Sequence, residues 1–504
     1  MDLSGVQTPV SLDARTVRLL PYHFARSKGV ITAREMNGEI EVWLRPDPES
    51  STLAEVRRMA GKPLKLVVLT AAEFAARLAA AYTSEDGATE QLIEDIGQDV
   101  NLQQLTELLP EVTDLLEAEN DAPIIKLINA LLTQAVREGA SDIHIEAFER
   151  RSLVRYRVDG QLRDVVEPKR SLHAALVSRV KVMAHLDIAE KRLPQDGRIT
   201  LRIAGHPVDV RVSTLPTGHG ERVVMRLLDK QAGRLSLDGL GMDAATLGRL
   251  DQLIHAPHGI LLVTGPTGSG KTTTLYAALS RLDHRTRNMM TVEDPIEYDL
   301  DGIGQTQVNT RIDMSFARAL RAILRQDPDV IMIGEIRDLE TAQIAVQASL
   351  TGHLVLATLH TNSAAGAVTR LVDMGIEPYL LSSTLIGVLA QRLVRKLCPA
   401  CRAPHVPDEA EGEVLSAARN TTQKIFAPAG CAACGWSGFK GRTGIYELLT
   451  IDESMRKLIH DVASERDLAA AAQHKGMRTL RDDGLRWVGE GVTSLEEVLR
   501  VTRE

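Results

Sequence analysis

Short apolar runs with little polar alternation mark residues 259–359. Four of them read GILLVTG, MMTVED, VIMIGE and LVLATLH, and helix-like segments separate them. Uninterrupted apolar runs of this length are typical of strands that are buried on both faces of a parallel sheet. The alternation of strand and helix therefore predicts an α/β core over residues 241–396.

The preceding segment, residues 122–240, has a different pattern. PIIKLINALLTQAVREGA has helical periodicity, with Asp121 as a candidate cap and Pro123 in the first turn. Six strand-like segments follow: IHIEA, LVRYRV, QLRDVVE, RITLRIA, HPVDVRVSTL and RVVMRLL. An Asp159-Gly160 turn joins the second to the third, and a second helix, SLHAALVSRVKVMAHL, leads to the last three. This order predicts an α+β domain with an antiparallel meander.

The two ends of the chain carry smaller units. Residues 1–82 alternate strand-like segments (GVITA, EIEVWLR, LKLVVLT) with helical ones (TLAEVRRMAG, AAEFAARLAAAY), which predicts a small α/β module. Residues 441–504 have mainly helical spacing, in SMRKLIHDV, ERDLAAAAQHKGM, RTLRDDGLRWVGEG and LEEVLRVT. With 504 residues, the chain is long enough for several domains.

Charge is distributed unevenly along the chain. Residues 83–121 hold 12 acidic residues and no basic ones, which predicts a solvated acidic linker, although LIEDI and LQQLTELL could form short helices. The whole chain has a net charge of −8, so the remainder, with 59 basic and 55 acidic residues, is slightly basic. The acidic balance and the 3 Trp, 7 Tyr and 6 Phe argue against a protein that binds nucleic acid.

The sequence also indicates a compartment. Its apolar runs are shorter than the ~18–20 residues that span a bilayer, and its start, MDLSGVQTPVSLDART, lacks the order of a signal peptide. We therefore expect a cytoplasmic protein that can still dock on a membrane through partners.

A glycine-rich loop follows the first buried strand of the α/β core. It fits G-x-x-x-x-G-K-[ST] at every position and opens a helix, which is the context that a phosphate-binding loop requires. Backbone N–H groups and the helix N-terminus favour phosphate, Lys271 can reach the β- and γ-phosphates, and Thr272 can bind Mg²⁺. The candidate nucleotide-binding residues are Gly265, Pro266, Thr267, Gly268, Ser269, Gly270, Lys271, Thr272 and Thr273.

Carboxylates and histidines accompany the later strands. Glu335 follows the strand VIMIG, where it can orient and deprotonate water, although a solvated glutamate is the alternative. Glu293, Asp294 and Glu297 form either an Mg²⁺-associated cluster or a plain acidic turn. Another buried strand lies between two histidines: His353 precedes it, and His360 follows it, where a side chain can sense phosphate. The extra strand between the loop and Glu335 suggests the RecA-like branch of nucleotide hydrolases.

All four cysteines fall in two Cys-x-x-Cys pairs, Cys398/Cys401 and Cys431/Cys434, within residues 397–440. In a reducing compartment this spacing favours a metal over disulfides, and four thiolates suit a closed structural Zn²⁺ site. Redox-active or free thiols are the alternative. Basic residues nearby form either a solvated face or a contact with acidic lipid or a partner: Arg392, Arg395, Lys396, Arg402, Lys440 and Arg442.

Four segments in order resemble the secretion ATPases of the type II secretion and type IV pilus superfamily. They are the loop GPTGSGKTTTLY, an aspartate box TVEDPIEY, a Walker B stretch DPDVIMIGEIRD and a histidine box TGHLVLATLHTN. The resemblance covers residues 120–504, and SDIHIE…RVDG and LPTGHGERVVMRLLD extend it to the domain before the motor. LPYHFARSKGV near the N-terminus resembles the type II secretion branch.

The resemblance implies a fold and a set of roles. The fold is a RecA-like P-loop core with a preceding PAS-like α+β domain, an N-terminal docking module and a tetracysteine zinc module. Catalytic roles would fall on Lys271, Glu335, Glu293, Glu297 and His360, with Arg211 and Arg226 reaching in from the preceding domain; Asp294 and His353 would contact the nucleotide. Three arginines flank the Walker B stretch, and each could either act at the nucleotide site or form an ion pair on the surface: Arg321, Arg325 and Arg337.

The resemblance also implies a function. It predicts an ATPase that powers type II protein secretion by driving assembly of a pilus-like fibre at the inner membrane, with ATP, Mg²⁺ and structural Zn²⁺ as cofactors. Its partners would be an inner-membrane L-type protein, bound through residues 1–82, an inner-membrane platform protein and further copies in a homo-hexamer, with no nucleic acid. A type IV pilus assembly ATPase is the near alternative. The distant alternatives are a nucleic-acid translocase and a nucleotide-binding scaffold that hydrolyses little.

Overall fold

The computed structural model describes residues 13, 16, 19–20, 25, 28–36, 38–46, 50–70, 73–74, 77, 102, 122–203, 206–229, 236–417 and 424–503. Most of the helix predicted over 71–82 and most of the predicted linker over 83–121, with the cap at Asp121, lie outside these residues.

The N-terminal module contains the three predicted strands. β1 (Val30–Met36) pairs antiparallel with β2 (Glu39–Leu44), β2 pairs in parallel with β3 (Leu64–Val68), and α3 (Ser50–Ala60) connects β2 to β3. Successive strand residues point to opposite faces. Accordingly, Ile31 and Trp43 pack in one buried cluster and Val30 and Val42 in another.

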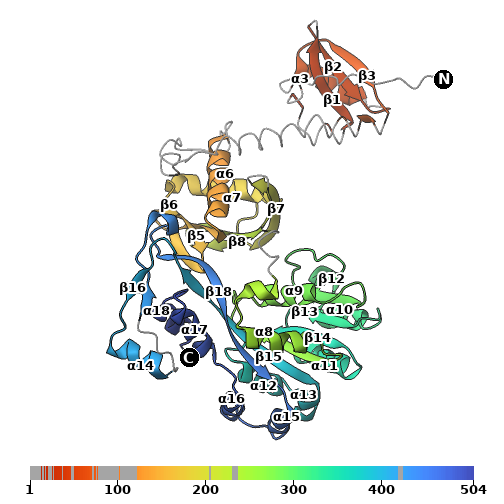
Figure 1. Ribbon diagram of the computed structural model, residues 1–504. Coiled ribbons are helices and arrows are strands. Elements are labelled where there is room, and N and C mark those ends of the chain that lie inside the picture. The colour runs from red at the N-terminus through yellow and green to blue at the C-terminus, as the bar shows by residue number, and fades with distance from the viewer. Residues whose placement is uncertain are drawn as a thin grey trace, which may run out of the picture.

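The α+β domain is a six-stranded antiparallel sheet covered on one face by two helices, α6 (Ala122–Arg137) and α7 (His173–Met183), as predicted (Figure 1). The strand order is β6-β5-β4-β9-β8-β7. Asp159 and Gly160, both at positive φ, form the predicted turn between β5 and β6. The strands are β4 (Ala140–Ala147), β5 (Ser152–Val158), β6 (Gln161–Val166), β7 (Gln195–Ile203), β8 (His206–Thr217) and β9 (Gly220–Asp229).

The predicted α/β core, called the motor below after the secretion ATPases that it resembles, is built on a seven-stranded sheet with the order β12-β11-β13-β14-β10-β15-β18, in which all pairs but β15–β18 are parallel. The four predicted strands are present and are joined by three that the sequence analysis did not predict. The seven are β10 (Gly259–Thr264), β11 (Met289–Glu293), β12 (Gly304–Gln307), β13 (Val330–Ile333), β14 (Leu354–Leu359), β15 (Leu385–Leu397) and β18 (Phe439–Thr450).

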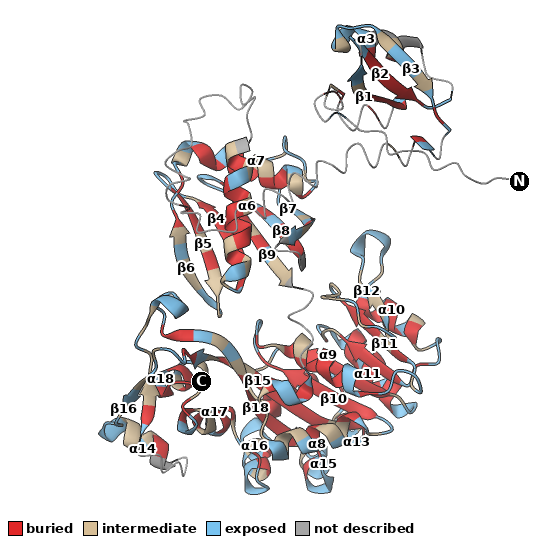
Figure 2. Ribbon diagram, turned by 45° about the horizontal axis from the view of Figure 1, so that its top comes forward, coloured by how far each residue is buried: buried red, intermediate tan, exposed pale blue. Residues whose placement is uncertain are grey.

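Helices cover both faces of this sheet, which explains the continuous apolar runs. Ile260 and Leu262 of β10 face one buried cluster, and Leu261 and Val263 face the other. Figure 2 shows the inner strands as buried. The helices from the motor onward are α8 (Ala244–Ile254), α9 (Lys271–Arg281), α10 (Phe316–Ile323), α11 (Leu339–Leu350), α12 (Ala364–Asp373), α13 (Pro378–Thr384), α14 (Glu409–Ala417), α15 (Glu453–His460), α16 (Glu465–His474), α17 (Leu480–Gly489) and α18 (Leu495–Val501).

The C-terminal part differs from the expected arrangement. The sequence predicts helices after residue 441, but β18 extends to Thr450 and completes the motor sheet beside β15 before α15 begins. The cysteine segment, with β16 (Ala403–His405) and β17 (Ile425–Ala427), is therefore inserted between two paired strands. Because those strands are paired, the position of this insertion is tied to the motor sheet.

Candidate functional site

Parallel register brings the candidate groups to one edge of the motor sheet. Thr264 of β10 is aligned with Leu359 of β14, so the first residue of the phosphate loop lies at the same level as His360. Ile333 of β13 is aligned with Val292 of β11, which places Glu335 and Glu293 near the same level. These positions lie at the carboxyl ends of the parallel strands, where ligands bind in open α/β sheets.

The phosphate loop has the backbone that its glycines predict. Gly265, Gly268 and Gly270 all have positive φ, and a Cβ on Gly265 would lie 2.3 Å from the carbonyl oxygen of Gln391. Only glycine combines that φ with so close an approach. α9 begins directly after the loop, at Lys271, so its N-terminal N–H groups open onto the site.

Lys271 occupies the centre of the loop. Its Nζ donates to the carbonyl oxygens of Gly265 (2.7 Å) and Pro266 (3.2 Å). Burial lowers the pKa of Lys271 from its ordinary value because it disfavours the charged ammonium, and Glu335 acts in the opposite direction. The buried ammonium therefore lies close to a carboxylate that favours its charged form.

His360 links Lys271 to Glu335. Lys271 Nζ lies 3.4 Å from His360 Nδ1, and His360 Nε2 lies 3.4 Å from Glu335 Oε2. An ammonium can only donate, so in this contact Nδ1 accepts and Nε2 carries the proton that faces Glu335. Arg337 also donates to Glu335. The structure thus brings together the phosphate loop, the carboxylate after β13 and the histidine after β14, as the sequence predicts.

The three acidic residues of the aspartate box have different surroundings. Glu293 is buried and accepts hydrogen bonds from Tyr276, from Thr291 Oγ1 (2.5 Å) and from Gln305 Nε2 (3.1 Å). Burial and the bond to Glu293 raise the pKa of Tyr276, which keeps its hydroxyl protonated. Glu293 therefore holds the side chains of Tyr276, Thr291 and Gln305 together beside the site.

Asp294 and Glu297 lie closer to the arginines. Asp294 Oδ2 is 3.8 Å from Arg337 Nη1, and Glu297 Oε2 is 3.2 Å from Arg211 Nη2. Arg211 also donates to the carbonyl oxygen of Ile296 (2.9 Å). Since Arg211 comes from β8, this contact joins the α+β domain to the aspartate box of the motor.

The structure does not bring two of the expected residues into this group. Arg226 on β9 pairs with Asp142 of its own domain (2.9 Å). His353 precedes β14, a strand of six residues, and therefore lies at the opposite edge of the sheet, roughly 20 Å along the strand from His360. Its Nδ1 instead contacts the carbonyl oxygen of Ala348 (2.8 Å).

The remaining arginines are also placed. Arg321 pairs with Glu340, and Arg325 donates to the carbonyl oxygen of Arg321 (2.8 Å), so both make local contacts on and beside α10. Arg337 alone of these three contacts Glu335. Sequence reasoning did not single out Tyr276, Gln305 or Gln391 near the site; for Gln391, the available signal is a glutamine within the apolar run LIGVLAQRLV.

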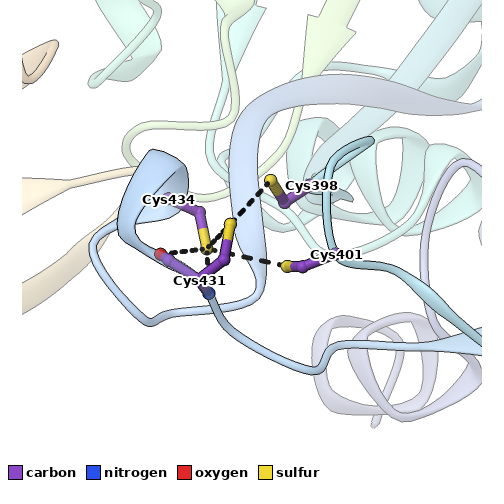
Figure 3. Close-up of side chains that lie close together, drawn as sticks. All are labelled: Cys398, Cys401, Cys431 and Cys434. Atoms are coloured by element: carbon purple, nitrogen blue, oxygen red, sulfur yellow. Dashed lines mark hydrogen bonds between the residues drawn. The ribbon is translucent and has the colours of Figure 1, made fainter.

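The four cysteines converge although 29 residues separate the two pairs. Their sulfurs all lie within 4.8 Å of one another, with Sγ–Sγ distances of 4.0 Å for Cys398–Cys431 and 3.8 Å for both Cys401–Cys434 and Cys431–Cys434 (Figure 3). A tetrahedron with Zn–S bonds of about 2.3 Å has edges of about 3.8 Å, so the four thiols fit such an ion.

Backbone donors support one of these sulfurs. The N–H groups of Cys431 and Gly438 each lie 3.2 Å from Cys434 Sγ. Such contacts stabilise a thiolate, which is the form that binds a metal.

Comparison with known proteins agrees with this geometry. The family model described as "Type II/IV secretion system protein" matches residues 117–500. The chain belongs to this family. A second model, for a domain of "GSPII protein E", matches residues 19–82, so the chain carries a further family domain in its N-terminal part, as its sequence suggests.

Curated relatives match the chain over nearly its whole length. "Type II secretion system protein E" of Pseudomonas aeruginosa is 59% identical over 497 residues, covering 98% of each chain. "Type II secretion system ATPase E" of Vibrio cholerae is 56% identical over 498 residues, again covering 98% of each. These relatives confirm the resemblance to the type II secretion branch and do not favour pilus assembly.

Solved structures agree with the fold. The pilus retraction motor PilT with bound ADP has a TM-score of 0.50 and 26% identity, and the match covers 74% of this chain and 96% of that one. The Legionella pneumophila ATPase DotB has a TM-score of 0.55 and 21% identity, covering 74% and 94%. Among the described residues, no helix is both long and apolar enough to cross a membrane.

Proposed function

We propose that the chain hydrolyses ATP at the carboxyl edge of the motor sheet and that this reaction powers protein export through a type II secretion system. The observation that carries the proposal is the Lys271–His360–Glu335 arrangement, which connects the phosphate loop to a candidate general base. Relatives that are named as type II secretion proteins support the assignment to this secretion system.

Each group at this edge has a chemical task. The loop N–H groups and Lys271 hold the phosphates, the Thr272 hydroxyl is the candidate Mg²⁺ ligand, and Mg²⁺ supplies charge neutralisation. Glu335 accepts a proton from the attacking water, and the contacts from Arg337 and His360 fix the orientation of its carboxylate. Asp294 and Glu297 belong to the loop that follows β11. The N–H of Glu297 donates to the hydroxyl of Tyr276 (3.3 Å), which in turn donates to Glu293, so Glu293 helps to hold this loop.

Arg211 is the proposed link between hydrolysis and domain movement. It reaches the aspartate box from the α+β domain, so closing or opening that domain changes the positive charge near the nucleotide. We expect Arg211→Ala to lower the turnover of ATP by about 10-fold or more, corresponding to one lost charge-assisted hydrogen bond. Steady-state phosphate release by the purified full chain measures this.

Arg226→Ala is the matched comparison. Arg226 forms an ion pair with Asp142 of its own domain, so removal of the Arg226 side chain should reduce turnover less than removal of the Arg211 side chain. Equal turnover of Arg211→Ala and the wild type would contradict the assignment of the coupling role to Arg211.

The finer organisation is proposed from the same family relationship. Residues 1–82 would dock on an inner-membrane L-type protein, 83–121 would tether that module to the motor, and six chains would form a ring in the cytoplasm against a platform protein. The N-terminal domain match supports the docking role. The full chain should co-purify with the L-type protein, and a chain starting at residue 83 should not; equal recovery of both would contradict docking through residues 1–82.

A further inference from the structure

Gln391 is a polar side chain in the apolar interior of the motor. β15 runs parallel to β10, and Ala390 is aligned with Thr264, so Gln391 is level with Gly265, the first residue of the phosphate loop. Gln391 is 1% exposed. An amide buried to this degree is costly unless both its donor and its acceptor find partners.

Both halves of this amide are paired within the loop and the helix that follows it. Gln391 Nε2 donates to the carbonyl oxygen of Ser269 (2.7 Å), and Gln391 Oε1 accepts from the hydroxyl of Thr274 on α9 (2.8 Å). The carbonyl of Ser269 can only accept, so the amide nitrogen must face it. The position therefore requires a side chain that donates at one atom and accepts at the other.

The bond to Ser269 has a consequence for the next N–H group. The C=O and N–H of a trans peptide point in opposite directions. Because the Ser269 carbonyl is turned toward Gln391 in the core, the N–H of Gly270 in the same peptide is turned away from the core. Gly270 is the residue before α9, at the point where the loop opens toward its helix.

Contacts around the glycines restrict the same peptide. A Cβ on Gly270 would lie 3.3 Å from Gln391 Nε2, and a Cβ on Gly265 would meet the Gln391 carbonyl oxygen. The phosphate loop thus rests on Gln391 at both of these glycines.

We propose that Gln391 is a positioning residue for nucleotide binding, which holds the Ser269–Gly270 peptide so that the Gly270 N–H faces the phosphate side of the loop. It acts through the loop and does not touch the nucleotide. The inference rests on the proposed ATPase function and deepens it.

Two substitutions separate positioning from packing. Gln391→Met keeps the length of the side chain but removes the donor, and we expect it to weaken ADP binding by about 10-fold, the equivalent of one unsatisfied buried carbonyl. Thr274→Val keeps the shape of Thr274 and leaves the Ser269 bond intact, so ADP affinity should stay within about twofold of the wild type. Isothermal titration of the full chain with ADP, together with its melting temperature, measures both effects.

The outcomes are distinct. The proposal is contradicted if Gln391→Met binds ADP as tightly as the wild type, or if Thr274→Val weakens ADP binding equally. If Gln391→Met does not fold, Gln391→Asn decides, because it keeps an uncharged amide but is one methylene group shorter, which withdraws the donor from Ser269; it should also raise the KM for ATP more than it lowers kcat. Absence of ADP binding by the wild type would instead refute the proposed function itself.

Discussion

Glu335→Gln is expected to lower the turnover number for ATP by about 10²- to 10⁴-fold, the usual contribution of a general base. The amide has nearly the same shape as the carboxylate and can still accept a hydrogen bond from Arg337, but it cannot take a proton from water. Lys271 and the N–H groups of the phosphate loop are unchanged, so ADP affinity should be retained. Phosphate release at saturating ATP and ADP titration measure the two quantities.

Glu340→Gln is the matched control for this variant. Glu340 lies five residues further along, in the first turn of α11, and is exposed beside Arg321. It should behave like the wild type. If Glu335→Gln kept more than about a tenth of the wild-type turnover, Glu335 would not be the general base.

Cys434→Ser is expected to remove the bound metal and to destabilise the C-terminal part of the motor. Cys434 lies within 3.8 Å of two of the other three sulfurs and receives two backbone contacts, so its loss opens the site to water. The destabilisation should reach about 4 kcal/mol, a size typical of metal loss. Elemental analysis should find about one zinc ion per wild-type chain and almost none in the variant.

Trp436→Ala is the control, because Trp436 is two residues away and is 75% exposed. It should retain zinc and stability. Zinc near zero in the wild-type protein would show that the four thiols do not form a zinc site. Equal melting temperatures of Cys434→Ser and the wild type would instead show that the ion does not stabilise the fold. Since the cysteine segment is inserted between β15 and β18, we expect the effect to extend to the motor sheet.

Much of the fold could be predicted from hydrophobic pattern. Strands that are buried on both faces, such as β10 and β14, are recognisable because every residue is apolar or threonine. β15 and β18 were not predicted: their sequences mix apolar residues with arginine, lysine and glycine, and their partners lie far along the chain. Strand preference of this kind is decided by the neighbouring strands rather than by local sequence.

The same distinction applies to the site. The residues of the phosphate loop, and the two cysteines within each pair, have short, fixed spacings, so their proximity follows from local sequence. The sequence already places His353 before β14, and its expected nucleotide contact came only from the family resemblance. The position of Arg226 depends instead on Asp142 from a neighbouring strand. Gln391 approaches the loop only because β15 pairs with β10, and no local sequence motif predicts that pairing.

The measurement that tests ATP hydrolysis at this edge most directly is a single-turnover experiment with γ-labelled ATP, Mg²⁺ and excess purified full chain. The wild type should cleave the bound ATP, which avoids any limit set by product release or by absent partners. Lys271→Ala should cleave it at least about 100-fold more slowly, because it removes the ammonium at the centre of the phosphate loop. Equal rates of cleavage by the two proteins would contradict hydrolysis at this site.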